Sequence, residues 1–222
     1  MQKSNFFKKK SFITILAVLF VMSTTLLSFS CTSTKSQKNN PNFLGDFDPV
    51  ELQSVMALTK QIGPLKPKEI KSVFYPRKNI IELYFTVTAS KIRLTFTPEL
   101  RQMFLDSAIQ FLNSVEEESL ENRSPKIKNA YSTSTVTIAW GVIGYGHSAK
   151  NAKIYLNYEF IEGKPYFLLQ TTSAIDDTEH QFYSPDIKVY FSPTQLTEFC
   201  EIISQENLLG IMEELNTKAF TY

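Results

Sequence analysis

The stretch that decides the fold is IIELYFTVTASKIRLTFTPEL, residues 80–100. Residues 80–89 and 92–96 are rich in β-branched and aromatic side chains, which favour strands. Ser90-Lys91 between them is a tight polar turn, as in an antiparallel hairpin. After the second run, Thr97-Pro98 offers a capping hydroxyl and a first-turn proline, both typical of a helix start. The stretch therefore predicts two paired strands followed by a helix.

A related string occurs later in the chain. Residues 187–193, IKVYFSP, match residues 92–98, IRLTFTP, in their order of Ile, basic, apolar, variable, Phe, hydroxyl and Pro. Each string is preceded by β-rich runs, at residues 70–75 and 80–89 in the first case and at 154–160 and 166–172 in the second. Chance likeness between two hairpin-plus-helix segments is the alternative explanation for this internal repeat.

The repeat predicts an α+β fold. Two β-β-β-α units, about residues 69–118 and 131–217, would form one or two antiparallel sheets, each unit burying a sheet face under its helix. A long strand over residues 131–145 would lead the second unit. In element order, this outline is similar to the Whirly and Pur folds, which bind single-stranded nucleic acid.

A further helix is expected before the first unit. Asp48-Pro49-Val50-Glu51 combines a capping residue, a first-turn proline and a glutamate at the capping-box position. Leu52, Val55 and Met56 would share one face, and Gly63-Pro64 would end the helix. The prediction is therefore an N-terminal helix that adds to the two repeat units.

The first thirty residues have the parts of an export signal. Lys3 and Lys8 to Lys10 form a basic start, residues 11–29 are apolar and uncharged, and Ser30 precedes Cys31. This ending resembles the lipobox of bacterial lipoproteins, and the resemblance implies that Cys31 carries lipid. The alternative is an uncleaved transmembrane helix over residues 11–29, since a bilayer is spanned by about 20 apolar residues.

Either anchor places the rest of the chain outside the cytoplasm. The resulting division is a signal peptide at residues 1–30, a polar flexible tether at 31–45 and a single domain at 46–222. The predicted location is the bacterial cell envelope, on the periplasmic side or at the outer membrane. The predicted membrane contact is the lipid on Cys31.

Charge argues against nucleic acid as a partner. The chain has 23 Lys and Arg, four of them in the signal, so the mature part has 19 against 22 Asp and Glu, or a net charge of −3. Nucleic acid is bound largely by basic side chains that neutralise phosphates. With Cys31 lipidated, Cys200 has no disulfide partner and is expected to be a buried structural thiol.

Few residues suggest chemistry. Asp176, Asp177 and Glu179 surround His180 in a polar loop, which has ligand types for a hard cation but matches no calcium-loop spacing. His147 lies beside Ser148 in a turn, and the chain has no G-x-S-x-G, H-E-x-x-H or P-loop pattern. We therefore predict no enzyme activity, metal or cofactor. A hydrolase using His147 or His180 is the alternative.

Aromatic residues on the predicted strands suggest how the domain acts. Tyr and Trp are favoured at interfaces because they bury area and keep a polar group. We predict a non-enzymatic, lipid-anchored envelope protein that binds another envelope protein through its sheet face. The alternatives are a periplasmic carrier of a small apolar ligand and an ordinary solvated sheet face. The predicted binding residues are Trp140, Tyr145, Tyr155, Tyr158 and Tyr166, with Tyr84 on a neighbouring strand.

Overall fold

Nine strands form one antiparallel sheet in the computed structural model, which describes residues 40–60 and 64–219. All of its elements belong to the unit that begins at Asn42. The strands are β1 (Val50–Glu51), β2 (Val55–Lys60), β3 (Lys66–Tyr75), β4 (Ile80–Val87), β5 (Ser90–Phe96), β6 (Ser132–Gly141), β7 (His147–Ile161), β8 (Lys164–Thr171) and β9 (Ile187–Phe191). The helices are α2 (Pro98–Glu116), the short 3-10 turn η2 (Ile127–Asn129), α3 (Pro193–Ile203) and α4 (Gln205–Ala219).

The sheet closes into a barrel. Each strand from β2 to β9 pairs with the next one along the chain, and β2 also pairs with β9 through Leu58↔Tyr190 and its neighbours. Eight strands therefore make a ring, and β1 is an additional strand on β3. The predicted α+β packing of two β-β-β-α units is wrong, and so is the Whirly-like and Pur-like outline, because closure puts the apolar face of the sheet inside a barrel.

The N-terminal helix is also wrong, and the segment that it would have occupied closes the ring. Residues 50–51 and 55–60 form β1 and β2 instead. Val55, Ala57 and Thr59 are buried while Met56 and Lys60 are exposed, which is the period of two that a strand requires. The local helix start signal is overridden because, as a strand, this segment buries one row of its side chains in the barrel.

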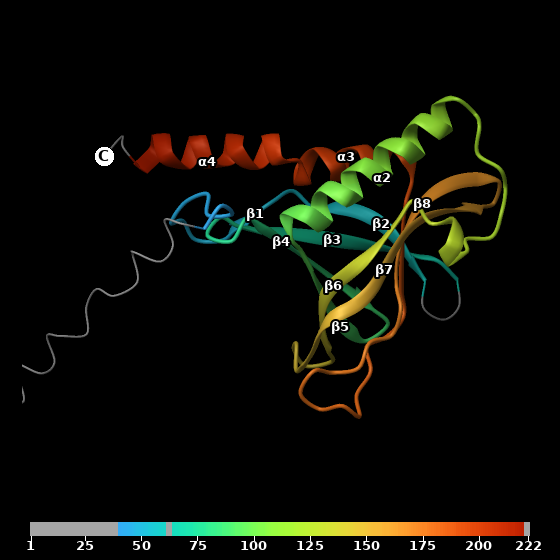
Figure 1. Ribbon diagram of the computed structural model, residues 1–222, viewed down its shortest axis with the longest axis horizontal. Coiled ribbons are helices and arrows are strands. Elements are labelled where there is room, and N and C mark those ends of the chain that lie inside the picture. The colour runs from blue at the N-terminus through green and yellow to red at the C-terminus, as the bar shows by residue number, and fades with distance from the viewer. Residues whose placement is uncertain (1–39, 61–63, 220–222) are drawn as a thin grey trace, which may run out of the picture. The chain divides into compact units, whose positions relative to one another are not determined.

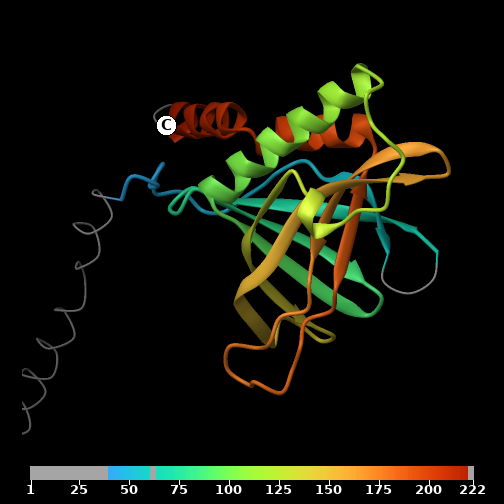
Figure 2. The same ribbon diagram turned by 45° about the vertical axis from the view of Figure 1, so that its right-hand side comes forward.

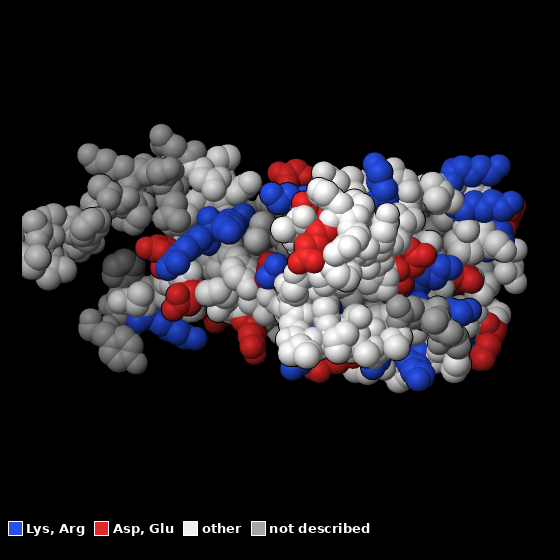
Figure 3. All heavy atoms as spheres, turned by 90° about the horizontal axis from the view of Figure 1, so that it is seen from below, with Lys and Arg blue, Asp and Glu red and all other residues white. Residues whose placement is uncertain are grey.

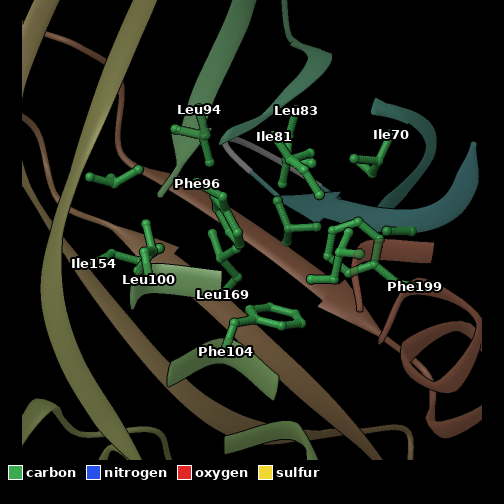
Figure 4. Close-up of a cluster of buried hydrophobic side chains, with 14 of the residues drawn as sticks. Ile70, Ile81, Leu83, Leu94, Phe96, Leu100, Phe104, Ile154, Leu169 and Phe199 are labelled. Carbon is green, nitrogen blue, oxygen red and sulfur yellow. The ribbon is translucent and has the colours of Figure 1, made fainter. Parts of the chain in front are cut away.

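Large apolar side chains fill the barrel, as expected for eight strands. Phe104 of α2 is central: its ring centroid lies 5.3 Å from that of Phe167, 5.4 Å from Phe199 and 5.8 Å from Phe96. Figure 4 shows Phe104 pointing toward Phe96 and Leu169 from the strands. The barrel core and the inner faces of α2 and α3 are thus one apolar cluster.

Helices α2 and α3 lie together at one end of the barrel (Figures 1 and 2). Both begin as the sequence predicts: Thr97 Oγ1 accepts from the N–H of Leu100 at 3.3 Å, and Ser192 forms a capping box with Gln195. Each helix therefore follows its strand as predicted, although the two helices cover a barrel end and not a flat sheet. Among the described residues, no helix has both the length and the apolar character that crossing a membrane requires.

Candidate binding surface on the outer sheet face

The side chains of β4 and β5 alternate between the barrel interior and its outer face. Leu83 and Leu94 are fully buried inside, and Glu82, Tyr84 and Arg93 lie on the opposite face. The strand register places Tyr84 directly opposite Arg93. An outer face in this part of the barrel therefore carries charged and aromatic groups side by side.

A hydrogen-bond network connects these outer side chains. The Tyr84 hydroxyl donates to the carboxylate of Glu82 and lies 3.1 Å from the hydroxyl of Tyr75. Thr95 Oγ1 lies 3.5 Å and Arg93 Nε 3.7 Å from the same carboxylate. Glu82 is only 8% exposed. Its neighbours therefore fix the position of the Glu82 carboxyl group.

Tyr145 joins the network from the loop between β6 and β7. Its ring centroid is 5.9 Å from that of Tyr84 in an edge-to-face arrangement, and the guanidinium carbon of Arg93 is 5.5 Å from the same centroid. Such aromatic and cation–π contacts stabilise a fixed ring position. With 39% of its surface exposed, Tyr145 still has area available to a partner.

The tyrosines of this surface are protonated donors at neutral pH. Burial is the largest cause that raises the pKa of Tyr84, and its hydrogen bond to Glu82 raises it further. Burial also raises the pKa of Tyr75 and of Tyr145 above the ordinary value for tyrosine. Each hydroxyl therefore keeps its proton and can both donate and accept a hydrogen bond.

Two hollows meet beside Tyr84. One has a volume of about 420 Å³ and the other of about 380 Å³, and Glu69, Lys71 and Tyr84 line both. Ser54 and Leu52 complete the first, while Lys91 and Tyr145 help to line the second. We call this region, with Tyr75, Glu82 and Arg93, the outer-face surface.

The predicted binding residues do not all lie on this surface. Tyr145 is part of it, whereas Tyr155 and Tyr166 lie partly buried on β7 and β8, on the alternation opposite to the buried Ile154 and Phe167. The side chains of Trp140 and Tyr158 point inward and are 5% and 3% exposed. Cys31 lies outside the described residues.

Sequence reasoning named Tyr84 and Tyr145 but missed the polar groups around them. Tyr75, Glu82, Arg93 and Lys71 have the strand phase opposite to the buried apolar residues, and this phase was the available signal. Their proximity to Tyr145 could not be read in the same way, because Tyr145 belongs to a loop that the barrel brings back over β4.

The start of β7, with His147, and the loop between β8 and β9, with His180, lie at the barrel end opposite the helices (Figures 1 and 2). His147 stacks against Trp140 and Phe182, at centroid distances of 5.6 and 4.5 Å, and its Nδ1 is 3.2 Å from a carboxylate oxygen of Asp176. His180 Nδ1 lies 2.9 Å from the backbone oxygen of Asp176. Among the described residues, no three His, Cys, Asp or Glu side chains gather in a way that could hold a metal ion.

The same end has exposed apolar side chains in two loops. Val142 and Ile143 follow β6, and Ile175, Phe182 and Tyr183 lie between β8 and β9, and all five are exposed. Figure 3, which views the molecule from this end, shows mostly uncharged atoms in the middle, with acidic side chains among and beside them and most Lys and Arg toward the margin. On α3, Cys200 is partly buried, and burial raises the pKa of its thiol to about 12, so the thiol is protonated and unreactive at neutral pH.

Comparison with known proteins gives a family without a described activity. A family model described as "Uncharacterised Treponema protein" matches residues 10–210. The chain is also similar to an "Uncharacterized protein" of Treponema pallidum (strain Nichols), at 22% identity over 183 residues. That match covers 81% of this chain and 66% of the relative, so the chain spans slightly less than two thirds of that relative's length. No solved structure matches.

Proposed function

The chain belongs to the family of uncharacterised Treponema proteins, and from that premise we propose that it is a lipid-anchored envelope protein that binds another envelope protein. The proposed contact is the outer-face surface, and the proposed anchor is a lipid on Cys31. The role is one of binding and not of catalysis. The single observation that carries this proposal is the pair of hollows that meet at Tyr84, between aromatic and charged side chains.

Several physical features of that surface support binding. Tyr and Arg are among the residue types that contribute most at protein interfaces, and Tyr84, Tyr145 and Arg93 are already held in contact with one another. A surface that is ordered before binding loses less side-chain entropy when the partner arrives. The basic start, the apolar run and Cys31 of the N-terminal sequence support the anchored location.

Crosslinking in the host envelope tests the binding part. We expect Lys71→Glu with Tyr145→Ala to lower the yield of the crosslinked partner at least tenfold, or about 1.4 kcal/mol of binding free energy. The matched control is Lys164→Glu with Tyr183→Ala, which makes the same changes at exposed positions elsewhere on the barrel. Equal yields from both double variants would sink the proposal. A small bound mass in native mass spectrometry would favour the carrier instead.

Detergent partitioning tests the anchor. We expect the wild-type chain to incorporate labelled fatty acid and to enter the detergent phase, and Cys31→Ser to lose the label. A lipidated chain should also have an intact mass that lacks residues 1–30. An unlabelled chain that retains those residues would contradict lipidation and favour the transmembrane anchor.

A further inference from the structure

β3 and β4 pair along only part of their length. Their register runs from Tyr75↔Ile80 to Lys71↔Tyr84 and ends there. Before Lys71, residues 66–70 of β3 pair with β2, and after Tyr84, residues 85–87 of β4 pair with β5. The two strands therefore diverge and leave a split. Residues 66–70 pair only with β2 and residues 85–87 only with β5, so the edges that face the split are unpaired.

Backbone direction identifies the groups that face this split. Along a strand, successive residues point their N–H and C=O groups to opposite sides. The carbonyl of Ser72 accepts from the N–H of Leu52 at 2.9 Å, so it points toward β1 and away from β4. Because these directions alternate, the backbone N–H and C=O of Lys71 point toward β4, and those of Glu69 point into the split.

The opposite wall offers a matching pair of groups. The backbone N–H and C=O of Lys71 point toward β4, and Lys71 lies opposite Tyr84. The backbone N–H and C=O of Tyr84 therefore point toward β3. Two residues further along β4, Thr86 points its N–H and C=O into the split from the other side. An extended segment placed between the strands could thus form ladder hydrogen bonds with Glu69 and Thr86.

The split opens to solvent as the hollow of about 380 Å³. Its walls come from both strands, and Tyr145 lies at its rim as one of the lining residues. Unpaired strand edges of this kind are normally covered or blocked in folded proteins because they pair readily with another strand. A hollow with two such edges and an aromatic rim is therefore suited to a strand from another chain.

Charge indicates what kind of strand fits. Lys68, Lys71 and Lys91 line the hollow together with one acidic residue, Glu69. Within the part of the chain that the structure describes, these three lysines take part in no ion pair. Glu69 accepts a hydrogen bond from Ser54 Oγ at 2.8 Å. The ammonium groups are therefore available to carboxylates of a partner.

We infer that the split between β3 and β4 binds an extended, acidic segment of the partner protein as an added strand. The segment pairs with the backbone of Glu69 and Thr86, and its carboxylates contact the three lysines, which is recognition by β-augmentation. This inference rests on the proposed function and specifies its mode and the chemistry of the partner.

Selection from a displayed library of short random peptides on the full-length chain tests the inference. We expect the selected peptides to be acidic and to slow amide hydrogen exchange at Glu69 and Thr86. N-methylation at alternate backbone positions of a selected peptide should weaken binding at least tenfold, because it removes the ladder donors. Lys68→Glu with Lys91→Glu should also weaken binding at least tenfold, whereas Lys128→Glu with Lys164→Glu should leave it unchanged.

Several results would overturn the inference. These are the absence of any selected peptide, selection of basic peptides, protection at other amides, or full binding by the N-methylated peptide. A single-stranded oligonucleotide that displaces the selected peptides would assign the split to nucleic acid. If the peptides fail while envelope crosslinking still depends on Lys71 and Tyr145, only the added strand is wrong. If both fail, the proposed function is wrong as well.

Discussion

At the residue scale, Asp176 connects the loop between β8 and β9 to the start of β7. Its carboxylate accepts from the N–H groups of Ser148 at 2.9 Å, Thr178 at 2.7 Å and Glu179 at 2.6 Å. The bond from Glu179 is the largest cause that lowers the pKa of Asp176, and the bonds from Thr178 and Ser148 lower it further. Asp176, which the sequence suggests as a possible cation ligand, therefore uses its carboxylate to bind backbone N–H groups of its own loop and of β7.

This lowered pKa predicts a pH dependence of stability. The ionised carboxylate stabilises the fold above the ordinary Asp pKa of about 3.9, and that stabilisation is lost as the pH falls through the lower folded-state value. Asp176→Asn should lower the melting temperature by several degrees at neutral pH, and the difference from wild type should shrink toward pH ~3. Thermal unfolding followed by circular dichroism measures it. Asp106→Asn, at an exposed position of α2, is the control, and a loss of stability that does not depend on pH would contradict this role of Asp176.

At the scale of elements, local signals predicted those parts that depend on neighbours in sequence. The strand at residues 187–191 and the helices after Thr97 and Ser192 were predicted because strand formers, a capping hydroxyl and proline occur within a few residues. The helix expected from Asp48 is wrong because local signals do not include tertiary packing. The helix start signal is present in the sequence, but the packing of β2 in the barrel determines the structure of this segment. Trp140 and Tyr158 were chosen for the sheet face, and the phase of neighbouring buried residues would have placed them inward.

Helix α2 is predicted to depend on one side chain. Phe104 is fully buried and contacts rings from three strands and from α3. Phe104→Ala should lower the free energy of unfolding by about 3–5 kcal/mol, because it removes these contacts and leaves a cavity. Ile109→Ala on the same helix, where 54% of the side chain is exposed, should change it by less than about 0.5 kcal/mol. Urea unfolding measures both, and similar losses would show that α2 does not anchor the barrel end.

At the scale of the whole molecule, the pairing of β2 with β9 turns a sheet into a ring. This pairing could not be predicted from local patterns, because Leu58 and Tyr190 are 132 positions apart in the chain. The outer-face surface was only partly predictable for the same reason: strand phase gives Tyr84 and Arg93, but only closure defines where β3 and β4 separate.

The ring closure itself is testable with proline. The backbone N–H and C=O of Ile70 point toward β2, so those of its partner Val55, and of Ala57, point toward β3. By the same alternation, the backbone groups of Met56 and Leu58 point toward β9. The register with β9 includes Leu58 but not Met56. Leu58→Pro should therefore lower the free energy of unfolding by about 1–3 kcal/mol more than Met56→Pro, since it also removes a ladder hydrogen bond. Equal losses in urea unfolding would mean that this bond does not contribute to closure.

Ring closure also determines when the barrel can form during synthesis of the chain. β2 is made early and β9 late, so in a chain emerging from the ribosome β2 can pair with β3 at once, but its other edge has no partner until residues 188–190 of β9 have been made. Until that moment β2 and β8 both present open edges, which invite pairing with other nascent chains. The barrel can therefore close only after β9 has been made. A chain that is cut before β9 keeps an open sheet, with unpaired edges on β2 and β8 that can pair with other chains.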